Sequence, residues 1–73
     1  MPKLPRFSGR EVVKIFQHFG WVVVRQRGSH IILVKGNHNA TLSDPDHKEV
    51  AQGILRGLIR NAGLSVEAFL ENS

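Results

Sequence analysis

WVVVRQRGSHIILVK, at residues 21–35, holds two runs of β-branched and apolar residues with Gly28 and Ser29 between them. Valine and isoleucine favour a pleated strand, and a two-residue loop with glycine in its first position suits a type II′ hairpin turn. The stretch therefore predicts two antiparallel strands, Trp21–Arg27 and His30–Lys35, joined by a two-residue turn.

The register of this hairpin decides which side chains share a face. Three cross-strand pairs are expected on one face: Arg27 with His30, Arg25 with Ile32, and Val23 with Val34. The other face would carry Val22, Val24, Ile31 and Leu33. Because this second set is uniformly apolar, helices should cover it, which leaves His30 beside Arg25 and Arg27 on the open face. A bulge at Gly28 would instead turn His30 inward.

His30 is the candidate catalytic residue. An imidazole titrates near neutrality and can act as a general base, and neighbouring cationic groups bind phosphate and stabilise developing negative charge. Arg25, Arg27 and Lys35 are the candidate cations, and Ser29 is a candidate accessory residue next to His30. The alternative is that His30 only fills a strand position.

The same register predicts an apolar area on the open face, farther from the turn. Its members would be Trp21, Val23, Ile32 and Val34. Such an area often marks an interface, with a partner protein or with a second copy of the chain as a homodimer. Alternatively, the N-terminal segment or the tail of the chain covers Trp21 and its neighbours.

A helix should precede the hairpin. Ser8 and Glu11 have the spacing of a capping box, and Gly20 is placed to end the helix. The apolar positions Val12, Ile15, Phe16 and Phe19 follow helical spacing and give the helix one apolar face.

After the hairpin, residues 36–39 should form a second turn and residues 40–43 a short third strand, which Asp44 and Pro45 interrupt. Helical periodicity then continues from Val50 to a stop at Gly63, with a start somewhere between Asp46 and Gln52, and residues 65–70 add a short final helix. The predicted class is α+β, in the order α-β-β-β-α(-α), with a three-stranded antiparallel meander and the helices on one face.

Composition agrees with a single domain spanning residues 1–73, since 73 residues cannot be divided into two cores. Ten Lys and Arg against six Asp and Glu give a formal charge of +4, which suits a phosphate-bearing partner. There is no cysteine, and no apolar run is long enough to span a bilayer, so a cytoplasmic protein with no membrane partner is expected.

Three other polar residues could each have a functional role or a purely structural one. His47 could give a proton to a leaving oxygen or hold phosphate, or it could make a local structural contact. Arg56 and Arg60, four residues apart on the second helix, could bind an RNA backbone or form a solvated surface. Gly53 and Gly57 weaken that helix, which suggests the close approach of a backbone or of RNA. The histidines lack metal-site spacing, so neither a metal nor another cofactor is expected, and His18 and His38 should be surface residues.

Four motifs carry a family resemblance. They are Gly28-Ser29-His30, Pro45-Asp46-His47, Gly53-Ile54-Leu55, and Ile59-Arg60-Asn61-Ala62-Gly63-Leu64-Ser65. With them the chain resembles the HicA (YcfA-like) toxins, from the first predicted helix through Ser65.

The resemblance implies a fold similar to the double-stranded-RNA-binding domain and endoribonuclease activity on messenger RNA. It also implies one essential histidine, which matches His30, and a HicB-type antitoxin partner. Ile54 departs from the family pattern, which usually has threonine there, so a role of that hydroxyl is lost.

Cleavage would then proceed without a metal, by attack of a ribose 2′-hydroxyl on the neighbouring phosphorus. Two other classes of function remain open. A non-catalytic RNA-binding module needs only the basic open face, and an interaction protein needs only its apolar part.

Overall fold

The computed structural model describes residues 4–36 and 40–73. The elements follow in the order α1 (Gly9–His18), β1 (Trp21–Arg27), β2 (His30–Lys35), β3 (Thr41–Pro45), α2 (Gln52–Asn61) and α3 (Val66–Glu71). This confirms the predicted order. The third strand is longer than predicted and includes Asp44 and Pro45, because it is an edge strand, where proline is tolerated. His38 and part of the predicted second turn lie outside the described residues.

Helix α1 begins as the sequence predicts. The Ser8 hydroxyl accepts a hydrogen bond from the Glu11 backbone N–H at 3.1 Å, and the Glu11 carboxylate accepts one from the Ser8 N–H at 2.8 Å. The hydrogen bond from the Ser8 backbone lowers the pKa of Glu11, because it stabilises the ionised form. Val12, Ile15 and Phe16 are buried on the inner face of the helix.

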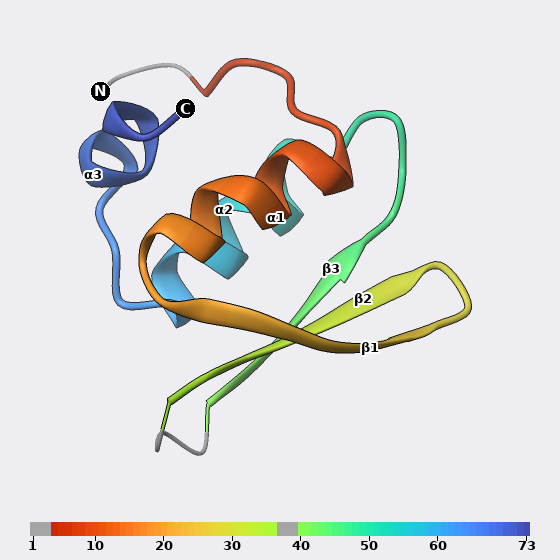
Figure 1. Ribbon diagram of the computed structural model, residues 1–73. Coiled ribbons are helices and arrows are strands. Elements are labelled where there is room, and N and C mark those ends of the chain that lie inside the picture. The colour runs from red at the N-terminus through yellow and green to blue at the C-terminus, as the bar shows by residue number, and fades with distance from the viewer. Residues whose placement is uncertain (1–3, 37–39) are drawn as a thin grey trace.

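The three strands form an antiparallel sheet in the order β1-β2-β3, and the helices lie on one side of it (Figure 1). Helix α1 packs on β1 and β3, and α2 packs on β3. The opposite face of the sheet is left uncovered by helices. The predicted meander with helices on one face is therefore confirmed.

The turn between β1 and β2 also has the predicted form. Gly28 has a φ of +58°, and no residue other than glycine has a positive φ among those that the structure describes. Ser29 in the second loop position therefore has a negative φ, as a type II′ turn requires.

The register of β1 differs from the prediction beyond the middle of the strand. Arg27 pairs with His30 and Arg25 with Ile32, as predicted, but Val23 pairs with Leu33 instead of Val34. The pairing shifts between Val23 and Arg25, where β1 contains a β-bulge. The extra residue reverses the alternation of faces for everything before it in the strand.

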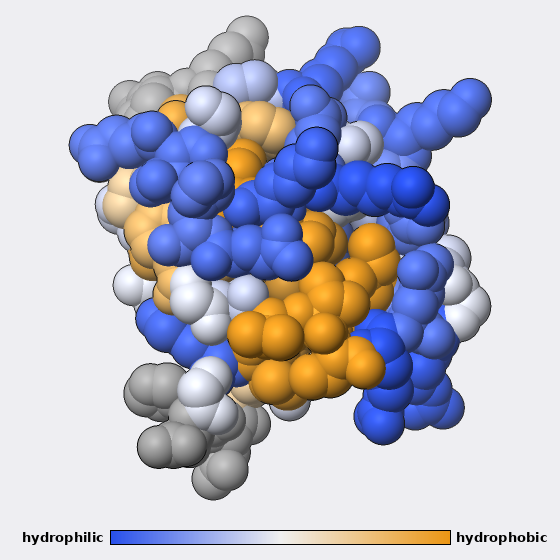
Figure 2. All heavy atoms as spheres, in the orientation of Figure 1, coloured by the Kyte–Doolittle hydropathy of each residue, from blue (hydrophilic) through white to orange (hydrophobic). Residues whose placement is uncertain are grey.

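Four of the predicted face assignments are wrong for this reason. Trp21 and Val23 were expected on the open face, but they pair with residues of the helix-covered face, and Trp21 is only 3% exposed. Val22 and Val24 were expected to be buried, and more than half of each side chain is exposed. The exposed apolar area of the open face is therefore formed by Val22 and Val24, with Ile32 and Val34 half-buried beside them, while Val23 is 38% exposed on the other side of the strand. Figure 2 shows this area over β1, with hydrophilic surface around it.

The core lies between the sheet and the helices and includes an aromatic cluster. Phe16 lies at its centre, with ring centroids 5.4 Å from Phe69 and 6.3 Å from Trp21, and Phe7 meets Phe69 edge-on at 5.6 Å. Through Phe69, the short helix α3 is fixed to the N-terminal part of the chain. No helix in the two described segments is long and apolar enough to cross a membrane.

Candidate nucleic-acid interface on the open face

His30 is the first residue of β2, directly after the turn, and its side chain is exposed. It pairs with Arg27 on one side and with Pro45 of β3 on the other. Since paired residues project to the same face, the side chains of Arg27 and His30 start side by side on the open face, and both line the same hollow. The β-bulge lies between Val23 and Arg25, away from the turn, so it leaves His30 on the open face as predicted.

A shallow hollow surrounds His30. It is lined by Arg27, Gly28, His30, Ile32 and Ser43, which come from all three strands and from the turn. Arg25 pairs with Ile32, one row farther along the strands. The structure thus brings His30, Arg25 and Arg27 together on one exposed face, which is the grouping that the sequence predicted.

Ser43 was not among the residues predicted for the site. It pairs with Ile32 and carries an exposed hydroxyl at the rim of the hollow. Its position could have been found from the strand alternation of β3, once Thr41–Pro45 is paired with β2. Ser43 was predicted to lie in the third strand, but no register between the second and third strands was predicted, so this position was missed.

Ser29 and His47 lie at the same end of the sheet as His30. The Ser29 carbonyl accepts a hydrogen bond from the Asp46 backbone N–H at 2.6 Å, which joins the turn to the end of β3. His47 is exposed and follows Pro45 by two residues, and its carbonyl accepts a hydrogen bond from the Gly9 N–H at 2.9 Å. The backbone of His47 has a structural contact, while its imidazole remains available to solvent.

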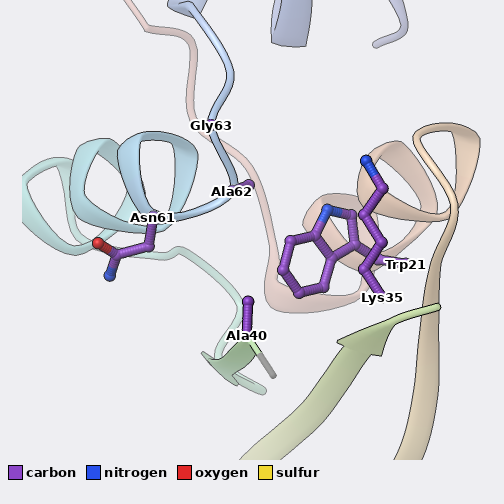
Figure 3. Close-up of a pocket in the computed structure, with 6 residues that line it drawn as sticks. All are labelled: Trp21, Lys35, Ala40, Asn61, Ala62 and Gly63. Atoms are coloured by element: carbon purple, nitrogen blue, oxygen red, sulfur yellow. The ribbon is translucent and has the colours of Figure 1, made fainter. Parts of the chain in front are cut away.

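Lys35 lies elsewhere. It pairs with Trp21 at the other end of the hairpin, on the helix-covered face. There it lines a separate hollow with Trp21, Ala40, Asn61, Ala62 and Gly63 (Figure 3). The structure therefore does not bring Lys35 to His30.

Arg56 and Arg60 belong to α2 and line a third hollow, with Ile59, Leu64 and Val66. This part of the surface belongs to the helical layer, while His30 lies on the face without helices. The five predicted RNA-binding cations consequently fall into three separate places, of which only the one with Arg25 and Arg27 includes the histidine.

The first turns of α2 have no side-chain cap, and few contacts with other described residues cover them. Ala51 precedes the helix and supplies no side-chain capping bond, and Ile54 is half-exposed. A Cβ added at Gly53 or Gly57 would meet no atom within 4 Å among the residues that the structure describes. Of the two reasons expected for these glycines, the approach of another segment of the described chain is therefore not supported.

Asp44 is the one buried charged residue of the described core. It follows Ser43 on β3 and points to the covered face, where neither carboxylate oxygen has a hydrogen-bond partner among the described residues. Burial raises the pKa of Asp44 to about 7, and the negative charge of Asp46 adds to this effect. A carboxyl group in this position is stabilised in its protonated form.

The region that contains this site matches a known protein family. A family model described as the HicA toxin of bacterial toxin–antitoxin systems matches residues 9–64, from the first residue of α1 to the residues just beyond α2. This chain belongs to the HicA toxin family. It is accordingly a toxin of a toxin–antitoxin system, and the match includes His30, Arg25, Arg27 and Asp46. The search of curated proteins and the search of solved structures each gave no match.

Helix α3 of this HicA toxin lies beyond the matched region. Its contribution is clear from the structure, because Phe69 is fully buried against Phe7 and Phe16. Among the described residues, the family match covers the three strands, helices α1 and α2, and the whole of the His30 hollow.

Proposed function

We propose that this HicA toxin is an endoribonuclease that cleaves messenger RNA, with His30 as the general base. The observation that carries the proposal is the exposed imidazole beside two guanidinium groups on an open sheet face, in a chain of a toxin family. A shallow, exposed site suits a single-stranded RNA, whose bases and backbone are accessible without opening a duplex. A fold similar to the double-stranded-RNA-binding domain is compatible with the observed order of elements.

The proposed reaction needs no metal. The imidazole of His30 takes the proton of a ribose 2′-hydroxyl, the 2′-oxygen attacks the adjacent phosphorus, and the bond from phosphorus to the 5′-oxygen breaks. Arg27 and Arg25 stabilise the negative charge that develops on the phosphate oxygens. The leaving 5′-oxygen takes a proton from His47 or from water. The products are a 2′,3′-cyclic phosphate and a 5′-hydroxyl.

A site with one base and two cations should give a slow nuclease. A positioned general base contributes about 10²- to 10⁴-fold, and the exposed guanidinium groups act in a medium close to water. Lys35, Arg56 and Arg60 are too far from the His30 hollow in the fold to act on the same phosphate. Their proposed role is contact with more distant parts of the RNA backbone.

The antitoxin is proposed to be a HicB-like protein that covers the open face. The apolar area at Val22 and Val24 adjoins the Arg25 and Arg27 region on the same strand. A partner seated there would bury exposed valines and block access to His30 in one contact. A second copy of the chain is the other candidate for this area.

The proposal is tested with purified wild type, His30→Ala and His18→Ala, each incubated with end-labelled single-stranded RNA and a chelator. His18 is an exposed histidine on α1 and serves as the matched control. We expect wild type and His18→Ala to cleave and His30→Ala to be inactive, with cyclic phosphate at the new 3′ ends. Products with 5′-phosphates, loss of activity with chelator, or full activity in His30→Ala would contradict the mechanism.

A second candidate function is RNA binding without cleavage. The net charge of +4 and the exposed Arg25 and Arg27 support binding by themselves. If wild type and His30→Ala bind RNA equally and neither cleaves it, this second function replaces the first. Binding that does not weaken as salt rises would point instead to a pure protein-interaction role.

A further inference from the structure

The turn that precedes His30 is held by hydrogen bonds that do not belong to the strand ladder. One link is the hydrogen bond from the Asp46 N–H to the Ser29 carbonyl. A second link is the Gln26 side-chain amide, which donates to the Gly28 carbonyl at 3.1 Å and to the Asp46 carboxylate at 3.2 Å. Both residues of the turn are therefore attached to the segment that follows β3.

The orientation of the Gln26 amide follows from its two partners. A carbonyl and a carboxylate are both acceptors, so only the NH₂ end of the amide can face them. Gln26 pairs with Ile31, whose side chain is buried, so Gln26 projects from the face opposite to His30. It reaches the turn from behind and does not occupy the hollow.

The Asp46 carboxylate also contacts helix α1, through the oxygen that does not face Gln26. Its second carboxylate oxygen accepts a hydrogen bond from the Arg10 guanidinium at 3.4 Å, and its side chain is only 20% exposed. At the start of α1, a Cβ on Gly9 would collide with the Pro45 carbonyl, so this glycine allows the helix to approach the end of β3 closely. The N-terminal end of α1 thus lies close against the end of β3 and contacts Asp46 through Arg10.

We propose that Asp46 and Gln26 are positioning residues for His30. The inference rests on the proposed function, because it assigns these two residues to the same reaction. A two-residue turn with glycine is conformationally permissive, and an exposed hairpin tip can fray. One backbone hydrogen bond and the Gln26 side-chain bridge hold the Gly28–Ser29 turn, so that the imidazole of the next residue keeps one place relative to the phosphate. A displacement of the base by about 1 Å can lower the rate by about 100-fold.

The kinetic arm of the test separates positioning from RNA binding. Cleavage is measured against RNA concentration for wild type, Asp46→Ala, Gln26→Ala and the double variant, at a temperature where each is folded. We expect kcat to fall by about 10- to 100-fold in each single variant with KM nearly unchanged. The kcat of the double variant should be no lower than that of the more impaired single variant, because both changes remove the same bridge.

Two further variants sharpen this arm. Asp46→Asn keeps an oxygen that can accept from the Gln26 amide, so it should restore most of kcat. Glu49→Ala is the matched control, since Glu49 is a nearby acid whose only described ion pair is with the exposed Arg6 at 3.8 Å. Wild-type kcat in Asp46→Ala and Gln26→Ala, or equal loss in Glu49→Ala, would overturn the inference.

The second arm does not depend on cleavage. Backbone order parameters of Gly28, Ser29 and His30 are measured by NMR relaxation in wild type, Gln26→Ala and Asp46→Asn. We expect the three residues to become more mobile in Gln26→Ala and to stay ordered in Asp46→Asn. An equally ordered turn in Gln26→Ala overturns the inference even if the protein cleaves RNA. A loosened turn in a protein whose wild type does not cleave RNA supports the structural link and rejects the proposed function.

Discussion

The two ends of the β1–β2 hairpin belong to the same two strands but present different surfaces. At the turn, Arg27 and His30 pair in the register expected from the loop, and they remain exposed. At the base, beyond the bulge, Trp21 is buried under the helices and Val22 is exposed. One extra residue in β1 thus lets a single hairpin anchor in the core at one end and present polar groups at the other. The difference separates the part of the sheet that stabilises the fold from the part proposed to act on RNA.

The largest expected effect is on the free energy of unfolding, at the base of the β1–β2 hairpin. Trp21→Ala should lower the free energy of unfolding by about 3–5 kcal/mol, because the ring is buried against Phe16. Val22→Ala, one residue along, should change it by less than about 0.5 kcal/mol. Urea unfolding followed by circular dichroism measures both. Similar losses in the two variants would mean that the bulge does not separate a buried residue from an exposed one.

The second largest effect is the pH dependence of stability caused by Asp44, which is buried on the helix-covered face near the β1–β2 turn. Its pKa in the folded protein is raised to about 7, so folding takes up a proton over the range between its usual value of 3.8 and about 7. The stability that this group contributes is fully present below pH 3.8 and is lost as pH rises through about 7. Asp44→Asn should therefore raise the free energy of unfolding at pH 8, by about 1–3 kcal/mol, and much less at pH 4.

The measurement compares unfolding of wild type and Asp44→Asn at pH 4, 6 and 8. Glu71→Gln, a neutralised acid at the exposed C-terminal end of α3, is the control and should show no such pH-dependent gain. A gain in Asp44→Asn that is the same at all three pH values would show that the carboxyl group does not change its charge with folding.

Much of this fold was readable from local patterns. The Ser8 and Glu11 capping box, the Gly28 turn and the stop at Gly63 each act through a few neighbouring residues, and each was predicted correctly. The register near the turn followed from the loop length, so His30 was placed correctly as well. The roles assigned to His30, Ser29, His47 and the five cations stay predictions, because position alone does not test chemistry.

What the sequence did not reveal depends on tertiary structure. Val22, Val23 and Val24 are chemically identical, so no pattern marks which of them is the extra residue in the ladder. The burial of Trp21 against Phe16 of α1 shows that the alternation is reversed, and the strand pairing identifies Val24 as the extra residue. Asp44 and Pro45 looked like strand breakers, so the last two rows of β3, Asp44 with Ile31 and Pro45 with His30, were not predicted. Residues that act through contacts distant in sequence, such as Asp46 with Ser29, were missed for the same reason.

A smaller effect is expected at the turn. Arg25→Gln and Arg27→Gln should each weaken RNA binding by about 1 kcal/mol and reduce the slope of log affinity against log salt by about one, because each removes one phosphate contact. Titration of a fluorescent RNA in the His30→Ala background, at several salt concentrations, measures both quantities. Arg60→Gln provides the comparison with the helical layer. If only Arg60→Gln lowers the slope, RNA lies on the helices and not on the open face.

The smallest effect on stability is expected for Val22→Ser and Val24→Ser, which alter exposed side chains next to the bulge. Each should change the free energy of unfolding by less than about 0.5 kcal/mol. If the antitoxin covers this part of the open face, each should weaken toxin–antitoxin binding by about 1 kcal/mol, which is about fivefold in Kd. Ile54→Ser is the matched control, since Ile54 is exposed to a similar degree but lies on α2. Calorimetric titration of the antitoxin into each variant distinguishes the two surfaces. Weakening by Ile54→Ser alone would place the antitoxin on the helical layer, and the valines would then have to be explained by a second copy of the chain.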